Sequence, residues 1–360
     1  MAEINRRVLR GFPPHLEAKG VFADRAGDSP VFMAIHMKPV CNFRCRKCFV
    51  EGVVNKPFKE ELTLREIEKI MGKAKDAGVL VFGITGAGEP LLDPKTKHVV
   101  KLANQAGFIT HLATNASCLD KATLEHFLEN NVTSVISLDS INPEEFSLLT
   151  GTSPAMLGKV ISNISLAQEV FRGTRKEENG LKIFRLGIHI TTSDANVGQA
   201  ELIRSMAESA DTLISLSPIA EIGAAEQNKE TIRTDLADLL GQSHITVIRP
   251  PSVPSPMCGF FRFGLDLNFD GSLLLDAHAI ETSGLLGNIR EFEMDAGAAF
   301  PFMKQVKDRF INEFGSHFCP VRSGRIGDFA EKLRMEKAVL AEIKAGAGQR
   351  YLPPEIRVLG

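Results

Sequence analysis

From about residue 30 to residue 250, short apolar runs alternate with amphipathic helical stretches, and this alternation limits the fold more than any other feature. The apolar runs are rich in β-branched and aromatic residues, which is typical of buried strands. Repeated strand-then-helix units favour a parallel sheet with right-handed crossovers. Six such units are too few for a closed eight-stranded barrel. We therefore predict an α/β fold with a partial (β/α)6 barrel of the TIM type.

The elements of this barrel can be placed along the chain. The predicted strands are residues 31–37, 79–85, 108–114, 132–138, 183–191 and 213–216. The predicted helices are residues 63–77, 93–107, 120–130, 156–172 and 197–209. Thr63 and Glu66 are typical of a capping box, and Asp93 followed by Pro94 is typical of a helix start. Residues 172–180 are highly charged, so we expect a solvated loop there.

A proline-rich string, P-P-S-V-P-S-P from Pro250 to Pro256, indicates a linker after the barrel, because proline at this density fits neither a helix nor a central strand. Residues 260–275 then predict a hairpin, with an Asp-Gly turn between two apolar runs. We expect a small second module of the α+β class to begin near residue 257. The predicted divisions are an N-terminal extension (1–30), the barrel (31–250), the second module (257–345) and a tail (346–360).

Composition excludes several classes of protein. The 360 residues are 44% hydrophobic and 24% charged, which is ordinary for a globular chain. The net charge of −2 leaves no basic footprint, so we expect no nucleic-acid partner. The first residues lack the apolar region of a signal peptide, and no apolar run reaches the roughly 18 residues of a membrane span. We expect a cytoplasmic protein without a membrane partner.

Three cysteines, Cys41, Cys45 and Cys48, lie within eight residues and are the clearest chemical signal in the chain. A structural zinc site needs a fourth Cys or His at short spacing, and none lies nearby. Disulfides are disfavoured in a reducing compartment. A [4Fe–4S] cluster usually takes four cysteine ligands, so three would leave one iron open to a small molecule. The spacing favours such a cluster.

Distinctive residues, many of them polar, follow the predicted strands at their carboxyl ends, where parallel α/β folds bind ligands. These residues are Gly86–Pro90, Thr114, Asn115, Asp139, Ser140, His189, Thr191, Thr192, Ser217 and Pro218. In the G-A-G-E-P string, the glycines allow a ligand to approach the backbone, and Glu89 adds a carboxylate. The string fits neither a dinucleotide fingerprint nor a P-loop. It suits a ligand that carries an ammonium group.

Together these residues resemble the radical S-adenosylmethionine (SAM) superfamily over residues 30–220. The motifs that carry the resemblance are C-x3-C-x2-C-F (Cys41 to Phe49), Thr85–Pro90, Thr114-Asn115 and Ser137–Ser140. The resemblance implies a [4Fe–4S] cluster on Cys41, Cys45 and Cys48 whose open iron binds SAM. It implies reductive cleavage of SAM to a 5′-deoxyadenosyl radical that abstracts hydrogen from substrate. A flavodoxin-type or ferredoxin-type protein would donate the electron.

The same resemblance implies contacts to SAM. The backbone at Phe49 would lie against adenine, and Gly86, Gly88 and Glu89 would meet the methionyl amino group. The candidates for contacts to the ribose and the carboxylate are Ser137, Asp139 and Thr191, and Asn115 is a further candidate for cofactor binding.

The second module resembles the SPASM/twitch domains of part of that superfamily, through Cys258-Gly259, Leu265–Gly271, Gly287–Ile289 and Cys319-Pro320. Two expected cysteines are missing: Leu275–His278 and Arg322 occupy their places. Cys258 and Cys319, with Asp276 or His278, could hold a second cluster. Alternatively that cluster has been lost, which the preference of such sites for thiolate favours. Cys258 or Cys319 would then be a candidate hydrogen-atom donor.

The resemblance implies an oxidoreductase-type radical enzyme that completes an oxidation, an epimerisation or a decarboxylation. Peptide-modifying relatives often carry an N-terminal leader-binding domain, and only about 30 residues precede the first predicted strand. We therefore expect a small polar metabolite, of the sugar, aminocyclitol or nucleoside type, as substrate. Two alternatives stay open: a maturase of ribosomal peptides, and a non-catalytic Fe–S scaffold or sensor. The G-A-G-E string argues against the last, because a sensor needs no SAM site.

Overall fold

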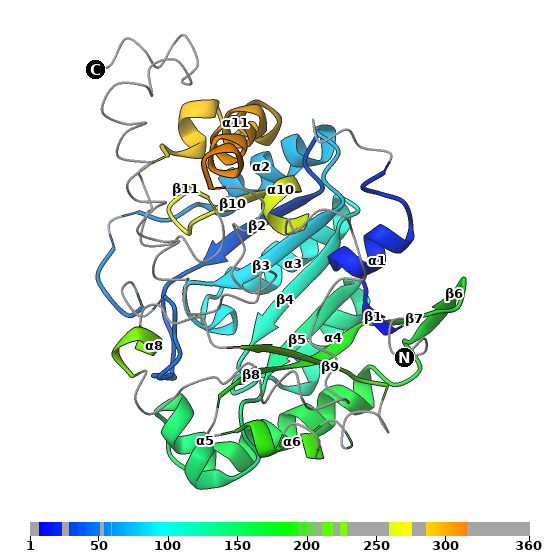
Figure 1. The fold of residues 1–360 in the computed structure, drawn as a ribbon, viewed down its shortest axis with the longest axis vertical. Coiled ribbons are helices and arrows are strands. Elements are labelled where there is room, and N and C mark those ends of the chain that lie inside the picture. Colours follow the sequence, from blue (N-terminus) through cyan, green and yellow to red (C-terminus); the bar gives the residue numbers. More distant parts are fainter. Residues whose placement is uncertain are drawn as a thin grey trace.

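A computed structural model provides the structure of the chain. It describes residues 7–23, 29–50, 54–58, 60–193, 196–199, 202–203, 205, 211–218, 224–228, 259–275 and 286–314. Their main feature is an eight-stranded sheet in the order β11-β10-β2-β3-β4-β5-β8-β9 (Figure 1). Within the described ranges, β11 and β9 form its two edges and the sheet does not close on itself. The predicted α/β class with a partial barrel is confirmed.

Six neighbouring parallel strands match the six predicted strands in position and order. They are β2 (Phe32–Met37), β3 (Val81–Gly86), β4 (Ile109–Thr114), β5 (Val132–Ser137), β8 (Leu186–Thr192) and β9 (Leu213–Pro218). The helices between them are α2 (Leu64–Asp76), α3 (Thr96–Gln105), α4 (Lys121–Glu129), α5 (Pro143–Thr150) and α6 (Ala155–Val170). No described helix is long and apolar enough to cross a membrane.

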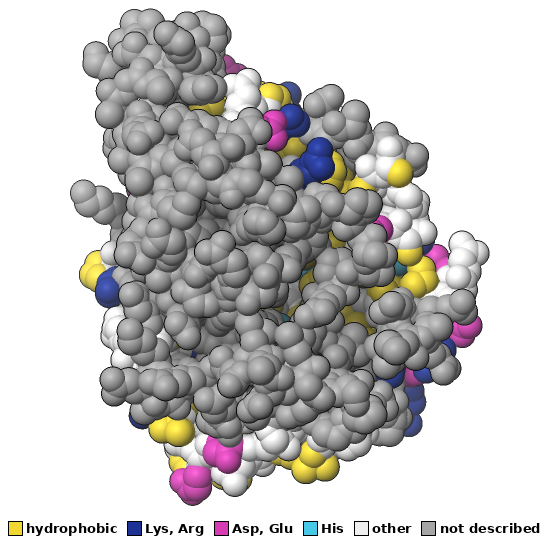
Figure 2. Space-filling view, viewed as in Figure 1, with side chains coloured by type: hydrophobic (Ala, Val, Ile, Leu, Met, Phe, Trp, Pro, Cys, Tyr) yellow, Lys and Arg dark blue, Asp and Glu magenta, His cyan; other side chains and the backbone are white. Residues whose placement is uncertain are grey.

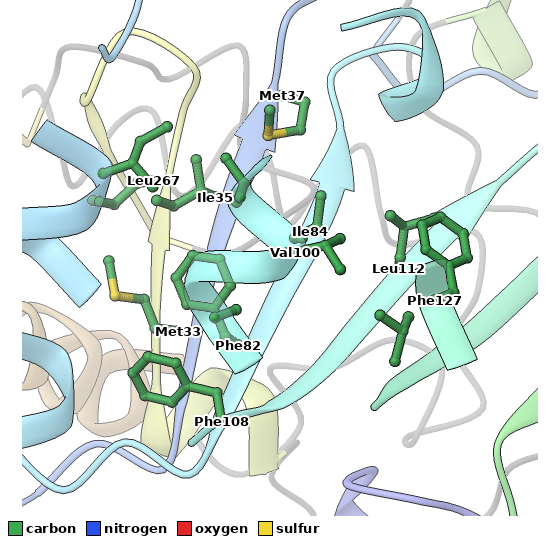
Figure 3. Packing of buried hydrophobic residues seen from close by; sticks show 14 of the residues in the cluster. Met33, Ile35, Met37, Phe82, Ile84, Val100, Phe108, Leu112, Phe127 and Leu267 are labelled. Carbon is green, nitrogen blue, oxygen red and sulfur yellow. The ribbon is translucent and has the colours of Figure 1, made fainter. Parts of the chain in front are cut away.

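The main hydrophobic core lies between the sheet and these helices. Alternate residues of β2, such as Met33 and Ile35, point to this side, as do Phe82 and Ile84 of β3 (Figure 3). They pack with Val100, Phe108 and Phe127 from the helical layer and the loops beside it. Because side chains alternate along a strand, the residues between them face the opposite side of the sheet. That second face and the carboxyl ends of the strands are left for the site.

The amino-terminal segment covers the opposite end of the strands. Strand β1 (Arg7–Leu9) pairs with β7 (Leu181–Phe184), and α1 (Pro13–Ala18) follows it (Figure 1). Phe12 stacks on His111 with ring centroids 4.2 Å apart, and the His111 ring is hydrogen-bonded to the Arg10 carbonyl oxygen at 2.9 Å. Burial lowers the pKa of His111 to about 4, so the ring is neutral at physiological pH. This histidine is a packing residue of the closed end.

Three predicted elements differ from the structure. The predicted strand 183–191 is divided between β7 and β8 at Arg185. The Arg185 side chain donates to the Val132 and Leu128 carbonyl oxygens at this break. The charged loop 172–180 contains a short exposed strand, β6 (Lys176–Glu178), antiparallel to β7. Helix α3 begins at Thr96 rather than at Pro94, after the short helix η2 (Pro90–Leu92).

The predicted hairpin is present, but its first residues are helical. Helix α10 (Gly259–Phe263) leads into β10 (Gly264–Leu267), which pairs with β11 (Leu273–Leu274) across the predicted turn. Strand β10 also pairs in parallel with β2, so it extends the barrel sheet. Short helix η5 (Ile289–Phe292) and helix α11 (Ala296–Phe314) follow. The predicted helix 197–209 lies largely outside the described residues; within it, Val197–Gln199 form the short helix η3.

Arg290 ties η5 to the start of α2. Its Nε and Nη2 atoms donate to the Glu66 carboxylate at 2.7 and 3.2 Å, and its Nη1 atom donates to the Asp270 carbonyl oxygen at 2.7 Å. Glu66 also completes the predicted capping box with Thr63. The hydrogen bond from Arg290 lowers the pKa of Glu66 to about 2.

Substitution of Glu66 tests this connection. Glu66→Gln keeps a residue suited to the capping box and removes the ion pair, so the free energy of unfolding at pH 7 should fall by about 1 kcal/mol. The folded-state pKa is depressed, so the difference from wild type should shrink as the pH falls from the ordinary value of 4.5 toward 2. Denaturant unfolding across this range measures it. Glu68→Gln, at an exposed position of α2, is the control, and an equal loss there would contradict the assignment.

Candidate active site

The three cysteines lie in the loop that leaves β2, and each is partly buried and outside any disulfide. The Cys48 amide donates to the Cys45 carbonyl oxygen at 3.1 Å, which forms a turn between the second and third cysteine. Two nitrogen donors point to the Cys41 sulfur: the Phe43 amide at 3.4 Å and the Asn115 side-chain amide at 4.0 Å. Hydrogen bonds to sulfur are among the features that tune iron–sulfur centres.

Helix α5 holds the middle of this Cys loop. The Arg44 and Arg46 amides donate to the carbonyl oxygens of Thr150 and Leu149, both at 2.9 Å, at the end of the helix. The helix ends at Gly151, whose φ of +64° is a conformation that favours glycine. A Cβ atom there would lie 2.5 Å from the Arg44 carbonyl oxygen. The absence of a side chain at this glycine therefore permits the close contact with the loop.

Asn55 and helix α8 (Ala224–Gln227) hold the two ends of the Cys loop. The Asn55 side chain accepts from the Cys41 amide and donates to the Cys41 carbonyl oxygen, both at 3.1 Å. The Ala224 amide donates to the Cys48 carbonyl oxygen at 2.9 Å. Figure 1 shows the loop after β2 beside α8, while α1 lies near the other end of the strands. The three cysteines are therefore fixed at the carboxyl edge of the sheet.

The Gly-rich string meets the Cys loop through its backbone. The Glu89 amide donates to the Val40 carbonyl oxygen at 2.8 Å. A Cβ atom on Gly88 would lie 2.3 Å from that same oxygen, and one on Gly86 would lie 2.0 Å from the Gly88 carbonyl oxygen. Both glycines are required by this close approach, whatever ligand binds beside them.

The Glu89 carboxylate is buried and accepts three hydrogen bonds. Its Oε1 atom accepts from the Thr114 hydroxyl at 2.7 Å and from the Leu91 amide at 3.0 Å, and its Oε2 atom accepts from the Asn115 amide at 2.7 Å. Burial raises the pKa of Glu89, and these three donors oppose the rise. The side chain therefore joins the carboxyl ends of β3 and β4 and places negative charge near Cys41, whose thiol pKa it helps to raise after burial.

Lys47, between the second and third cysteine, joins the loop to the ends of β5 and β8. Its ammonium nitrogen lies 2.5 Å from Asp139 Oδ1 and 2.6 Å from Thr191 Oγ1. The Thr191 amide donates to the same Asp139 oxygen at 3.1 Å. Asn196 completes the network by donating to the Asp139 and Thr191 carbonyl oxygens at 2.7 and 2.9 Å. The motifs predict Asp139 and Thr191 as site residues, whereas Lys47 has no sequence signal beyond its place in the Cys string.

The sheet face opposite the helices carries neutral hydrogen-bonding groups near this end. His189 of β8 lies between two hydroxyl groups of β9, with Nδ1 2.8 Å from Ser215 Oγ and Nε2 3.0 Å from Ser217 Oγ. Burial lowers the pKa of His189 to about 4, with a further contribution from Lys47. Ser137 is its register partner on β5. In Figure 2, hydrophobic side chains and small parts of His side chains are visible in a hollow near the centre of the viewed face.

The donor chemistry of the Cys loop fits an iron–sulfur cluster. Its three thiols, which form no disulfide, are soft ligands, and amide donors point to one of the sulfurs. Burial raises the pKa of the Cys45 thiol, and a bound metal would favour its ionised form. In the part of the chain that the structure describes, no group of three or more Cys, His, Asp or Glu side chains is arranged to hold a single metal ion.

The remaining predicted residues divide into two groups. Phe49 and Cys48 both pack against a small apolar cluster that contains Val50, Ala87 and Phe269, and Ala87 belongs to the Gly-rich string. The predicted residues of the second module, by contrast, fall outside the described ranges: Cys258, Asp276, His278 and Cys319. Their roles stay predictions.

Comparisons with known proteins agree with this geometry. A GTP 3′,8-cyclase of Brucella ovis is 29% identical over an alignment that covers 59% of this chain and 62% of the relative. A GTP 3′,8-cyclase of Brucella abortus (strain S19) gives the same values. The chain therefore spans less than two thirds of the length of these curated relatives.

Solved structures show a shared fold. SuiB of Streptococcus suis bound to S-adenosylmethionine has a TM-score of 0.52 and 19% identity, over 72% of this chain and 63% of that chain. The structure of anSMEcpe with bound AdoMet has a TM-score of 0.50 and 14% identity, over 87% of this chain and 99% of that chain. Residues 35–176, which contain the Cys loop and the Gly-rich string, match the family model of the radical SAM superfamily. Over these residues the chain is similar to the radical SAM superfamily, as its motifs predict.

Proposed function

We propose that this chain is a radical SAM enzyme whose cluster is held by Cys41, Cys45 and Cys48. The observation that carries the proposal is the backbone contact between the Cys loop and the Gly-rich string, where the Glu89 amide meets the Val40 carbonyl oxygen at 2.8 Å. This contact brings the loop with the three thiols next to the Gly-rich string and its Glu89 carboxylate. When bound, the cluster and SAM together supply a hydrogen-abstracting radical, which is the cofactor's own chemistry.

The protein's part is to bind and orient SAM. The buried Glu89 carboxylate would attract the methionyl ammonium, and the backbone of Gly86 and Gly88 would accept its N–H groups. The Phe49 backbone would lie against adenine. Contacts to ribose and carboxylate would come from the ends of β4, β5 and β8, through Asn115, Ser137, Asp139 and Thr191.

The same architecture separates the reaction from bulk water. The helical layer seals one face of the sheet, and the amino-terminal segment closes the end around His111. Substrate would therefore enter from the carboxyl edge, where the Cys loop lies. A reactive radical needs such an enclosure, because exclusion of water and other donors prevents side reactions.

The neutral groups on the inner face favour a small polar substrate. His189 carries one ring proton above pH 5 or so, given its pKa of about 4, so one of Ser215 and Ser217 donates to the ring and the other accepts. Their remaining donors and acceptors suit hydroxyl, amine or amide groups. We propose a metabolite of the sugar, aminocyclitol or nucleoside type, for oxidation, epimerisation or decarboxylation. The GTP 3′,8-cyclase relatives are named for a nucleotide substrate, which supports this class.

We propose further that the segment after residue 257 is a SPASM/twitch-like module that covers the substrate. Cys258 and Cys319 serve there either as ligands of a second cluster, with Asp276 or His278, or as hydrogen-atom donors. The electron for SAM cleavage would come from a flavodoxin-type or ferredoxin-type protein, and the cytoplasm is the compartment that suits the free thiols.

Cys45→Ala tests the enzymatic role. Removing one of three ligands should leave no stable cluster, so reduced, reconstituted Cys45→Ala should form no 5′-deoxyadenosine from SAM, whereas wild type does. The matched control is Cys118→Ala, at a partly buried thiol outside the Cys loop, which should keep the activity. Liquid chromatography with mass spectrometry measures the product. A fully clustered wild-type chain that forms none would contradict the enzyme and support a scaffold or sensor.

The substrate class is tested by isotope transfer. The enzyme is incubated with SAM, a reductant and deuterated sugars, aminocyclitols, nucleosides or peptides in separate pools. We expect deuterium to enter 5′-deoxyadenosine only from one of the small-metabolite pools, because a hydrogen is abstracted directly from the substrate carbon. Deuterium from the peptide pool would instead support a peptide maturase.

A further inference from the structure

Lys47 forms a buried ion pair inside the Cys loop itself. The Lys47 side chain is 15% exposed and the Asp139 side chain 5% exposed, and their charged atoms lie 2.5 Å apart. Solvent screens such a pair much less than it screens pairs on the surface. Removing one partner would leave the other charge buried and uncompensated. The pair is therefore a fixed arrangement of one positive and one negative charge beside the cysteines.

Both charges lie at the Cys loop. Lys47 is the direct neighbour of Cys48 in the sequence and lies two residues after Cys45. Its ammonium nitrogen lies 2.5 Å from the Asp139 carboxylate and 2.6 Å from the Thr191 hydroxyl, so the ion pair lies where the loop meets the ends of β5 and β8. A positive and a negative charge beside the same loop predict opposite effects on a centre there that gains or loses an electron.

We propose that Lys47 and Asp139 are positioning residues that fix the Cys loop to the rim of the sheet and set the reduction potential of the cluster it holds. The inference rests on the proposed function only in requiring a cluster on Cys41, Cys45 and Cys48. Reduction adds an electron and thus negative charge to the cluster. The Lys47 ammonium favours the reduced form and raises the potential, while the Asp139 carboxylate lowers it.

Thr191 holds both members of the Lys47–Asp139 ion pair in place. Its hydroxyl accepts from Lys47 and its amide donates to Asp139, so both charged groups are held by the same residue of β8. The network joins positions 47, 139 and 191, which are far apart in the sequence. The loop that carries the cysteines is thereby connected to two strand ends that are predicted to contact SAM.

The test is a redox titration of the reconstituted cluster, followed by electron paramagnetic resonance, in variants that remove one charge each. Lys47→Met has nearly the volume of lysine without its charge, and it should lower the midpoint potential. Asp139→Asn keeps an oxygen acceptor without the charge, and it should raise the potential. Lys47→Arg should stay near wild type. Lys121→Met, which removes a lysine that is 71% exposed on α4, is the control and should cause no shift.

The signs of the shifts separate an electrostatic role from damage to the loop. Disruption of the loop alone would shift the midpoint potentials of both variants in the same direction. That result, or an unchanged potential in Lys47→Met, would overturn the proposal. The double variant Lys47→Met/Asp139→Asn should show the sum of the two single shifts. If either single variant fails to hold a cluster, Lys47→Arg and Thr191→Val still test the role of the ion pair. Thr191→Val removes the hydroxyl that accepts from Lys47, so it should lower the potential.

Thermal unfolding of the cluster-free chain provides a second readout that does not depend on loading. Lys47→Met and Asp139→Asn should each lower the midpoint temperature of unfolding. The double variant should lower it by less than the sum of the two single effects, because it leaves no buried charge without its partner. Strictly additive losses would contradict the ion pair. Wild-type protein that holds a cluster but does not cleave SAM would sink the proposed enzyme while leaving this inference intact.

Discussion

The structure of the site depends on the close approach of two backbone segments, Val40 before the Cys loop and Gly88 after β3. Their separation leaves no room for a Cβ atom at Gly88, so this glycine is needed for packing before any ligand binds. The Glu89 amide closes the contact, and the Glu89 carboxylate then joins the end of β4. The cysteines and the Gly-rich string are thus parts of one rigid edge.

This edge is the candidate site because other described elements cover the helical face and the amino-terminal end of the sheet. The helices bury one face of the sheet, and Phe12 and His111 close the amino-terminal end of the strands. Within the described ranges, the carboxyl edge carries charged side chains at its rim and neutral hydroxyl and imidazole groups inside. That division fits a charged cofactor bound above a neutral polar substrate.

Local signals in the sequence predict the elements, and non-local contacts account for the errors. The capping box of Thr63 and Glu66 involves residues three apart, so the start of α2 is predicted correctly. The division between β7 and β8 depends on Arg185 reaching carbonyl oxygens more than 50 residues away, which periodicity cannot show. Lys47 is missed for the same reason, because its partner Asp139 is 92 residues distant and only the fold brings the two together.

A cluster held by Cys41, Cys45 and Cys48 leaves one iron for SAM. This can be tested by Mössbauer spectroscopy of the anaerobically reconstituted protein, recorded before and after addition of SAM. We expect a [4Fe–4S] cluster in which one iron changes its spectrum when SAM binds, because that iron alone lacks a cysteine ligand. A protein that assembles no cluster on these cysteines, or a cluster whose spectrum SAM leaves unchanged, would contradict it.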